Sequence, residues 1–279
     1  MPANTSAGTI TTPPPTPKSA LKTPAATPMT SRRTTTASYR MAVGADELLA
    51  SLAERPEAAA ILLDVDGTLA PIVARPELAT VPEETRAELR RLLGRYALVA
   101  AVSGRTGEDA AGVVGVDGPL YVGVHGLELA PEAESWRGPL HEFAETVDLP
   151  VEDKGLAIVF HYRGAPDEEA VRERLEDVAA DARELGLVAQ FGRKVLEVRP
   201  PIEADKGTAV QALLRERGLE RALYAGDDTT DLDAFRGLDG LELAVRVAVA
   251  SAEGPEKLVE AANIVVESPG DLTRLLARL

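Results

Sequence analysis

A short apolar run that ends in two aspartates constrains the fold of this chain more than any other feature. Residues 58–63 read Ala-Ala-Ala-Ile-Leu-Leu, and Asp64-Val65-Asp66-Gly67-Thr68 follows directly. An uninterrupted apolar run of this length is typical of a strand that is buried on both faces of a parallel sheet. In such sheets the reactive groups lie at the carboxyl ends of the strands, which is where both carboxylates fall.

The two carboxylates are two residues apart, so on an extended chain both point to one side while Val65 turns toward the core. Like charges this close are unfavourable without a cation or a shared proton. A divalent metal would remove the repulsion, and an all-oxygen site with few protein ligands suits Mg²⁺. The alternative interpretation is an ordinary turn, because Asp and Gly are both common in turns for local reasons.

The composition excludes several classes of partner and chemistry. The formal charge of −15 argues against nucleic acid and anionic membrane surfaces as partners. The absence of cysteine excludes disulfides, thiolate catalysis and Cys-ligated metals, and the three histidines lack the spacing of a zinc site. No apolar run approaches the ~20 residues that a membrane span needs. With 279 residues and 45% hydrophobic content, the chain is long enough for one large or two modest domains.

Residues 1–42 differ in composition from the rest of the chain. They are rich in Thr, Pro, Ser and Ala, contain no acidic residue and carry a charge of +5, so the remainder carries −20. Such a segment buries too little apolar surface to offset its chain entropy, and we expect a disordered tail. The same composition also resembles an organelle transit peptide, and a true start at Met41 is a further alternative.

The remaining sequence alternates strand and helix patterns, which predicts an α/β fold with a doubly wound parallel sheet. We expect helices at 45–53, 83–93, 168–185, 206–214 and 271–279. We expect strands at 58–63, 97–102, 120–124, 187–191, 195–199, 221–225, 241–249 and 263–266, with an alternating stretch at 155–163. The pattern between 125 and 201 suggests a small sheet with helices on one face. We therefore expect a core of residues 43–124 and 202–279 with an inserted cap, residues 125–201.

Polar groups stand at four strand or helix ends of the expected core. They are Asp-Val-Asp-Gly-Thr (64–68), Ser-Gly-Arg (103–105), Lys-Gly (206–207) and Gly-Asp-Asp (226–228). In this order and in these contexts they resemble the haloacid dehalogenase superfamily of phosphotransferases. The resemblance covers the chain after about residue 43 and implies a Rossmann-like core.

The resemblance also implies roles for these residues. Asp64 would attack phosphorus and form an aspartyl phosphate, and Asp66 would act as general acid and then as general base. Mg²⁺ would be bound by Asp64, the Asp66 carbonyl and Asp227, with Asp228 close behind. Ser103 and Lys206 would hold phosphate oxygens, and the expected phosphate site also includes Val65, Thr68, Gly104 and Arg105. The alternatives are a surface position for Lys206 and a helix N-cap for Asp228 or Asp231.

Within this superfamily the chain resembles the trehalose-6-phosphate phosphatases. The matching pieces are Gly-Val-His-Gly-Leu-Glu (123–128), Val-Glu-Asp-Lys (151–154), His-Tyr-Arg (161–163), Lys-Val-Leu-Glu-Val-Arg-Pro (194–200), Gly-Asp-Asp-Thr-Thr-Asp (226–231) and Asp-Ala-Phe (233–235). One departure is Leu232, where the family usually has an acidic residue, and it concerns only local helix contacts.

The resemblance assigns the sugar to the cap. Carboxylates accept from sugar hydroxyls and Lys donates to them, so Glu128, Lys194 and Glu197 are the expected sugar ligands. His125 and Gly126 would line the junction between core and cap. The alternative for each of these residues is a solvated surface charge, and for Glu197 it is also an ion pair with a neighbour on the strand. Lys154 and Arg163 are left out of the set.

The resemblance implies a cytoplasmic, Mg²⁺-dependent enzyme that hydrolyses trehalose 6-phosphate, with a functional link to a trehalose-6-phosphate synthase. One alternative is a phosphatase for sucrose phosphate or a glycosyl phosphoglycerate. The other is a sugar-phosphate sensor without catalysis, which would be expected to have lost Asp64 or Asp66.

Overall fold

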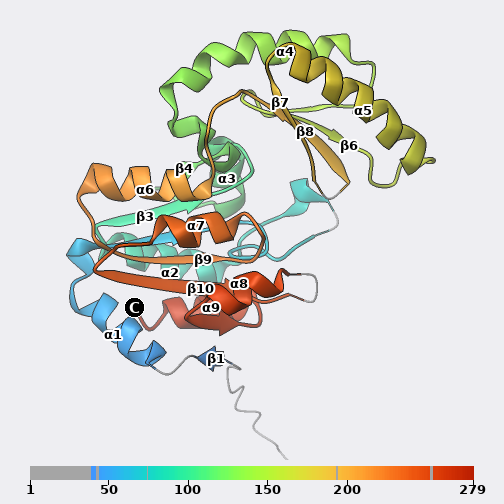
Figure 1. Cartoon of the computed structure of the whole chain (residues 1–279). Helices are drawn as coiled ribbons and strands as arrows, with labels where there is room; N and C mark the ends of the chain where they lie inside the picture. The colour runs from blue at the N-terminus through green and yellow to red at the C-terminus, as the bar shows by residue number, and fades with distance from the viewer. Residues whose placement is uncertain (1–38, 42–43, 74, 193, 252–253) are drawn as a thin grey trace, which may run out of the picture. The chain divides into compact units, whose positions relative to one another are not determined.

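The computed structural model describes residues 39–41, 44–73, 75–192, 194–251 and 254–279 (Figure 1). Most of the expected tail, residues 1–38 and 42, lies outside the described residues, so its disorder stays a prediction. The structure departs from that expectation at Tyr39–Met41, which form strand β1. This strand pairs antiparallel with β11 (Ile264–Val266) at the edge of the sheet. Three residues of the segment that we expected to be disordered therefore form backbone hydrogen bonds.

A seven-stranded sheet forms the centre of the described chain (Figure 1). Its spatial order is β1, β11, β10 (Leu243–Val249), β9 (Arg221–Gly226), β2 (Ala59–Leu63), β3 (Leu98–Val102) and β4 (Leu120–Val122). All neighbours except β1 and β11 are parallel. The chain first adds β3 and β4 on one side of β2 and later adds β9, β10 and β11 on the other. The order therefore reverses between β2 and β9, and ligands of such sheets bind at this switch point.

Helices cover both faces of this sheet, which confirms the doubly wound α/β fold. On one face α1 (Ala45–Glu54), α2 (Glu83–Leu93), α3 (Gly107–Val114) and α9 (Pro269–Leu276) pack on the side of Ile61 and Leu63. On the other face α6 (Lys206–Arg217), α7 (Asp231–Gly237) and α8 (Glu256–Ala261) pack on the side of Ala60 and Leu62. All five residues of β2 are buried, as its apolar run predicts.

A second, antiparallel sheet has the order β5 (Glu152–Asp153), β6 (Ile158–His161), β8 (Val195–Arg199) and β7 (Val188–Phe191). The helices α4 (Arg137–Thr146) and α5 (Glu168–Glu184) pack on one face of it, in an apolar cluster with Phe160 and Leu196. Helix α4 was not predicted, because Gly138 and Pro139 disfavour a helix interior. Both residues lie in its first turn, where Pro is tolerated. Four short 3₁₀ turns complete the elements: η1 (Pro56–Ala58), η2 (Pro76–Leu78), η3 (Val124–Leu129) and η4 (Pro131–Trp136).

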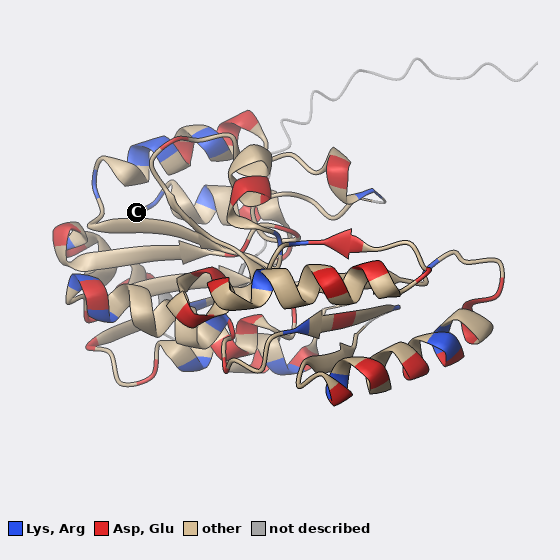
Figure 2. Ribbon diagram, turned by 90° about the horizontal axis from the view of Figure 1, so that it is seen from above, with Lys and Arg blue, Asp and Glu red and all other residues tan. Residues whose placement is uncertain are grey.

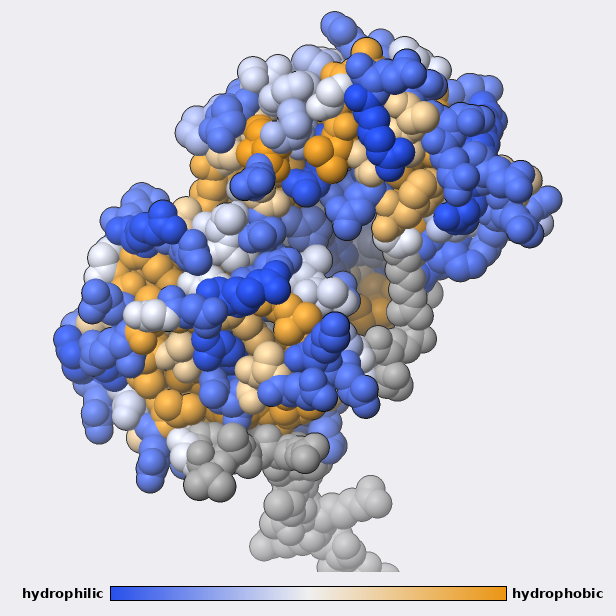
Figure 3. Space-filling model, in the orientation of Figure 1, coloured by the Kyte–Doolittle hydropathy of each residue, from blue (hydrophilic) through white to orange (hydrophobic). Residues whose placement is uncertain are grey.

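The surface agrees with the acidic composition. Asp and Glu lie on the helices of both sheets, and they outnumber Lys and Arg by 45 to 30 over the chain (Figure 2). The face in Figure 3 is mostly hydrophilic, with apolar residues in smaller groups. Among the described helices none is both long enough and apolar enough to cross a bilayer.

Candidate active site

The carboxyl ends of β2, β3 and β9 bring their polar residues to one edge of the sheet, as the sequence predicts. Asp64 follows β2, Ser103 follows β3, and Asp227 follows β9. Two further main-chain hydrogen bonds, Asp64 N to Ala225 O and Ser103 N to Val122 O, are both 2.9 Å and extend the sheet to these residues. Together with Lys206 they line a cavity of about 540 Å³, which we call the carboxylate cavity.

Lys206 occupies the floor of this cavity and is only 3% exposed. Its Nζ donates to Asp64 Oδ1 and to Asp231 Oδ1, both at 2.7 Å. Asp205 caps the start of α6 in a capping box with Thr208, and Lys206 is the first residue of this helix. Burial lowers the pKa of Lys206, but Asp231 and Asp64 outweigh burial and raise the pKa above its ordinary value. The ammonium therefore stays charged, and the alternative of a surface lysine is excluded.

Asp231 is a buried anchor that the sequence analysis considered only as a helix N-cap. Its Oδ1 accepts from Lys206 and from the Tyr224 hydroxyl at 2.8 Å. Its Oδ2 accepts from the main-chain N–H groups of Asp227 at 2.8 Å and Asp228 at 2.9 Å. These four donors use the acceptor capacity of the carboxylate. Asp231 therefore holds the loop between β9 and α7 and the ammonium of Lys206 in place.

A cluster of three carboxylates provides a candidate cation site. One oxygen each of Asp64, Asp227 and Asp231 lies within 4.8 Å of the other two. Burial raises the pKa of Asp64 to about 7, with Lys206 opposing and Asp231 adding to the effect. Burial, then Asp64 and Asp231, raise the pKa of Asp227 to about 8. Carboxylate oxygens that repel one another suit a hard divalent cation. Asp231 already accepts four hydrogen bonds, so Asp64 and Asp227 are the members of the cluster with acceptor capacity left for such an ion.

Asp228, which we expected close behind the cation, lies next to Asp227 in the loop after β9. Its side chain lines the carboxylate cavity but does not belong to the three-carboxylate cluster. Its main-chain N–H is instead bonded to Asp231. Its role at the cation therefore stays a prediction.

The turn after β2 supports Asp227. Gly67 has a φ of +81°, and a Cβ there would lie 2.0 Å from Asp227 Oδ2, so only glycine fits. The Thr68 hydroxyl donates to Asp227 Oδ1 at 3.3 Å, and the side chain of Val65 is buried in the core. In the structure Thr68 and Val65 thus support the site instead of presenting their side chains to the cavity.

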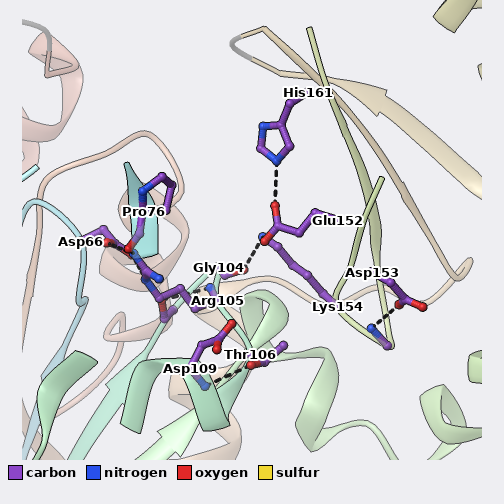
Figure 4. Close-up of polar contacts among 12 residues, drawn as sticks. Asp66, Pro76, Gly104, Arg105, Thr106, Asp109, Glu152, Asp153, Lys154 and His161 are labelled. Atoms are coloured by element: carbon purple, nitrogen blue, oxygen red, sulfur yellow. Dashed lines mark hydrogen bonds and ion pairs between the residues drawn. The ribbon is translucent and has the colours of Figure 1, made fainter. Parts of the chain in front are cut away.

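Asp66 is paired with Arg105 (Figure 4). The guanidinium donates from Nε and Nη2 to the two oxygens of Asp66 at 2.6 and 2.7 Å, and Nη2 also donates to the Pro76 carbonyl at 2.9 Å. The main-chain N–H of Arg105 donates to Ser103 Oγ at 3.1 Å. Arg105 therefore links the loop after β3 to the carboxylate and to the loop after β2.

Four residues at and beside the open edge of the small sheet also line the carboxylate cavity: Glu152, Lys154, His161 and Arg163. Lys154 Nζ donates to the Gly104 carbonyl at 2.9 Å, and His161 Nε2 lies 2.7 Å from Glu152 Oε2 (Figure 4). The sequence analysis did not include these four among the site residues. Their segments, 151–154 and 161–163, were nevertheless part of the family resemblance. That resemblance was the sequence signal that could have identified them as site residues.

A second, smaller cavity of about 280 Å³ adjoins the first and shares His125, Lys206 and Thr230 with it. We call it the side cavity; it contains Glu197 and Gln190 from the small sheet. Burial, with help from Lys206 and Lys154, lowers the pKa of His125 to about 4. Its buried Nδ1 makes no hydrogen bond to any described residue.

Three expected sugar-site residues lie outside both cavities. Gly126 packs against the start of α6, where a Cβ would lie 2.9 Å from the Asp205 carbonyl. Lys194 is ion-paired with Glu168 at the start of α5. Glu128 accepts main-chain N–H groups from Gly107 at 2.9 Å and Gly123 at 2.7 Å.

Comparison with known proteins agrees with this arrangement. The profile of the trehalose-phosphatase family matches residues 62–151 and 141–268. The chain belongs to the trehalose-phosphatase family. Members of this family are phosphoric monoester hydrolases, and the motifs at Asp64, Ser103, Lys206 and Asp227 all lie within the matched residues.

Relatives of the chain include longer proteins. A trehalose-phosphate phosphatase of Mycobacterium marinum is 34% identical over 248 residues, covering 79% of this chain and 61% of that protein. An uncharacterised glycosyl hydrolase of Mycobacterium tuberculosis is 36% identical over 217 residues, covering 67% of this chain and 16% of that protein. The crystal structure of a trehalose-6-phosphate phosphatase related protein has a TM-score of 0.63 at 25% identity, covering 78% of this chain and 95% of that one. The chain thus spans less than two thirds of both curated relatives.

Proposed function

We propose that this chain is a Mg²⁺-dependent phosphatase that hydrolyses trehalose 6-phosphate to trehalose and phosphate. The observation that carries the proposal is the carboxylate cavity, in which Asp64, bonded to the buried Lys206, faces residues of the small sheet. The charged and polar side chains that line this cavity suit a substrate with a phosphate ester and several hydroxyl groups. The family supports the sugar phosphate as substrate class. The reaction would follow that of a trehalose-6-phosphate synthase in the cytoplasm.

In the first step an oxygen of Asp64 would attack phosphorus, and the bond from phosphorus to the sugar oxygen would break. Ser103 and Lys206 line the same cavity and would hold phosphate oxygens. Asp66 would donate its proton to the departing sugar oxygen. Because both Asp66 oxygens accept from Arg105, one of them has to leave the guanidinium before Asp66 can carry and deliver that proton.

In the second step water would attack phosphorus of the aspartyl phosphate, and Asp66 would take the proton from that water. Asp64 would leave as a carboxylate, which restores the starting enzyme. Asp64 and Asp227 would hold Mg²⁺, with the Asp66 carbonyl as a further ligand. When bound, the ion supplies positive charge that offsets the repulsion between the carboxylates and the phosphate.

The sugar would lie against the open face of the small sheet. Glu152 and Glu197 provide acceptors for hydroxyl groups, and Lys154 provides a donor. His125 lies between the two cavities, and its low pKa keeps it neutral. We propose that residues 125–201 act as a cap that determines specificity in this way.

The test is phosphate release from a substrate panel in Mg²⁺ or EDTA. We expect metal-dependent release from trehalose 6-phosphate, and much slower release from sucrose 6-phosphate, glucose 6-phosphate and glucosyl-3-phosphoglycerate. Asp64→Asn should abolish release while still binding trehalose 6-phosphate. Preferred hydrolysis of another member of the panel would overturn the substrate. Binding of trehalose 6-phosphate without any release by the unmodified protein would indicate a sensor.

A further inference from the structure

Two neighbouring loops are joined by three hydrogen bonds beside the carboxylate cavity. The first is the phosphate loop, residues 103–107, and the second is the η3 loop, residues 123–128. Two bonds are between main chains, Val124 N to Arg105 O at 2.7 Å and His125 N to Ser103 O at 2.9 Å. The third runs from Gly107 N of the phosphate loop to the carboxylate of Glu128, which also accepts from Gly123 N within the η3 loop.

Glu128 bridges the two loops through one carboxylate oxygen and holds the start of its own loop through the other. Oε1 accepts from Gly107 N at 2.9 Å and Oε2 accepts from Gly123 N at 2.7 Å. Gly107 is the first residue of α3, where a free N–H and the helix dipole favour an anionic acceptor. Glu128 is exposed to solvent, yet it lines neither cavity. Its carboxylate is therefore directed at the backbone and away from the space proposed for the sugar.

The packing around this bridge leaves no room for other side chains. A Cβ on Gly123 would lie 2.3 Å from Gly107 N and 2.6 Å from Glu128 Oε1. A Cβ on Gly107 would lie 2.7 Å from Glu128 Oε2. The two glycines and the glutamate thus form one close-fitting contact, which joins the start of α3 to the end of β4.

An unfavourable backbone conformation lies between Gly123 and Glu128, and its two main-chain N–H groups donate to Arg105 O and Ser103 O of the phosphate loop. Val124 and His125 have φ of +48° and +53°, a region that side chains with a Cβ rarely adopt. Such a conformation persists only where surrounding contacts determine it. The η3 loop is held by the bonds from Glu128 and the phosphate loop, and the phosphate loop carries Ser103 and Arg105.

From this geometry we infer that Glu128 is a positioning residue, which fixes the phosphate loop and His125, and that it does not bind the sugar. The inference deepens the proposed function and rests on it. A sugar ligand and a positioning residue differ in one measurable respect. Loss of a sugar ligand weakens reaction only with sugar substrates, whereas a displaced phosphate loop weakens reaction with every phosphate ester.

The test compares Glu128→Gln with the unmodified protein on trehalose 6-phosphate and on p-nitrophenyl phosphate, which has no sugar. The amide can accept from only one of the two N–H groups, so the loops lose one bond. The matched control is Glu132→Gln, because Glu132 is exposed and its side chain makes no hydrogen bond or ion pair with the described residues. Circular dichroism and thermal unfolding establish that each variant is folded.

We expect kcat/KM of Glu128→Gln to fall about tenfold with both substrates, mainly through kcat, since small displacements of catalytic groups have effects of this size. The ratio of the two kcat/KM values should not change, and Glu132→Gln should match the unmodified protein. A fall confined to trehalose 6-phosphate would overturn the inference in favour of a sugar ligand. Unchanged kinetics with both substrates would overturn it as well.

A second variant addresses the same contact from the other side. Gly107→Ala places a methyl group against Glu128 Oε2 and should lower kcat with both substrates in the same proportion. Combined with Glu128→Gln it should add little, because both changes remove one bridge. If the two effects multiplied, Glu128 would not act through Gly107. If the unmodified protein failed on trehalose 6-phosphate, the p-nitrophenyl phosphate series would still test the bridge while the substrate proposal failed.

Discussion

Replacing Asp227 by asparagine should make the metal-free protein more stable, although it should abolish activity. The pKa of Asp227 is raised from 3.8 to about 8, first by burial and then by Asp64 and Asp231. The folded protein therefore holds a proton that the unfolded chain releases. Such a group favours the folded state below pH 3.8, and that contribution is lost as the pH rises toward 8.

The size of the effect follows from the shift. Between pH 3.8 and pH 7 the lost contribution is about 4 kcal/mol, at about 1.4 kcal/mol per pH unit. The carboxylate is only partly buried, so we halve this figure to about 2 kcal/mol to allow for solvent screening. Asparagine keeps an oxygen that can accept from Thr68, so the exchange removes the charge with little other loss.

Urea unfolding in EDTA at pH 7 and at pH 4 measures this difference. We expect the free energy of unfolding of Asp227→Asn to exceed that of the unmodified protein by about 2 kcal/mol at pH 7. At pH 4 the two values should be nearly equal. Mg²⁺ should stabilise the unmodified protein and have little effect on the variant. Asp228→Asn is the matched control and should have a smaller effect, because Asp228 lies outside the three-carboxylate cluster and raises the pKa of Asp227 less than burial, Asp64 and Asp231 do. A variant that is less stable in EDTA at pH 7, or equally favoured at both pH values, would refute the electrostatic reasoning.

Three further substitutions test other contacts of the site. Lys206→Met leaves Asp64 and Asp231 without their shared cation and should cost about 3 kcal/mol of unfolding free energy in EDTA at pH 7; a cost below 1 kcal/mol would contradict this. Arg105→Lys loses the two-point pairing with Asp66 and should lower kcat about tenfold in steady-state assays, and an unchanged kcat would speak against the pairing. Glu197→Gln should lower kcat/KM about tenfold for trehalose 6-phosphate but not for p-nitrophenyl phosphate; equal effects on both would remove Glu197 from the sugar site.

Much of the core was predictable, because local patterns determine it. The apolar run before Asp64 identified the central strand, and helix 83–93 was bounded correctly by Pro82 and Gly94. The meeting of Asp64, Ser103 and Asp227 follows from a single rule, that parallel strands end at the same edge of their sheet. Such rules need only sequence spacing and the hydrophobic pattern.

The direction of individual side chains was not predictable from the same information. Asp66 and Arg105 are 39 residues apart, and their pairing depends on how two loops face each other. Asp231 was weighed as a helix cap, because its bonds to Lys206 and Tyr224 depend on how α6 and α7 pack beside β9 on one face of the sheet. Glu128 was expected at the sugar because carboxylates suit hydroxyls, whereas the structure directs it to main-chain N–H groups. Residue chemistry suggested what each group could bind but not which partner lies within reach.

The central claim, that Asp64 receives the phosphoryl group, is tested most directly by the reaction of Asp66→Asn with p-nitrophenyl phosphate. This leaving group needs no general acid, so the first step should proceed while the second step lacks its base. We expect a burst of one equivalent of p-nitrophenol and, after acid quench, a peptide containing Asp64 with the added mass of one phosphoryl group. Turnover by the variant without a burst or covalent phosphate, or phosphate on another residue, would contradict the account.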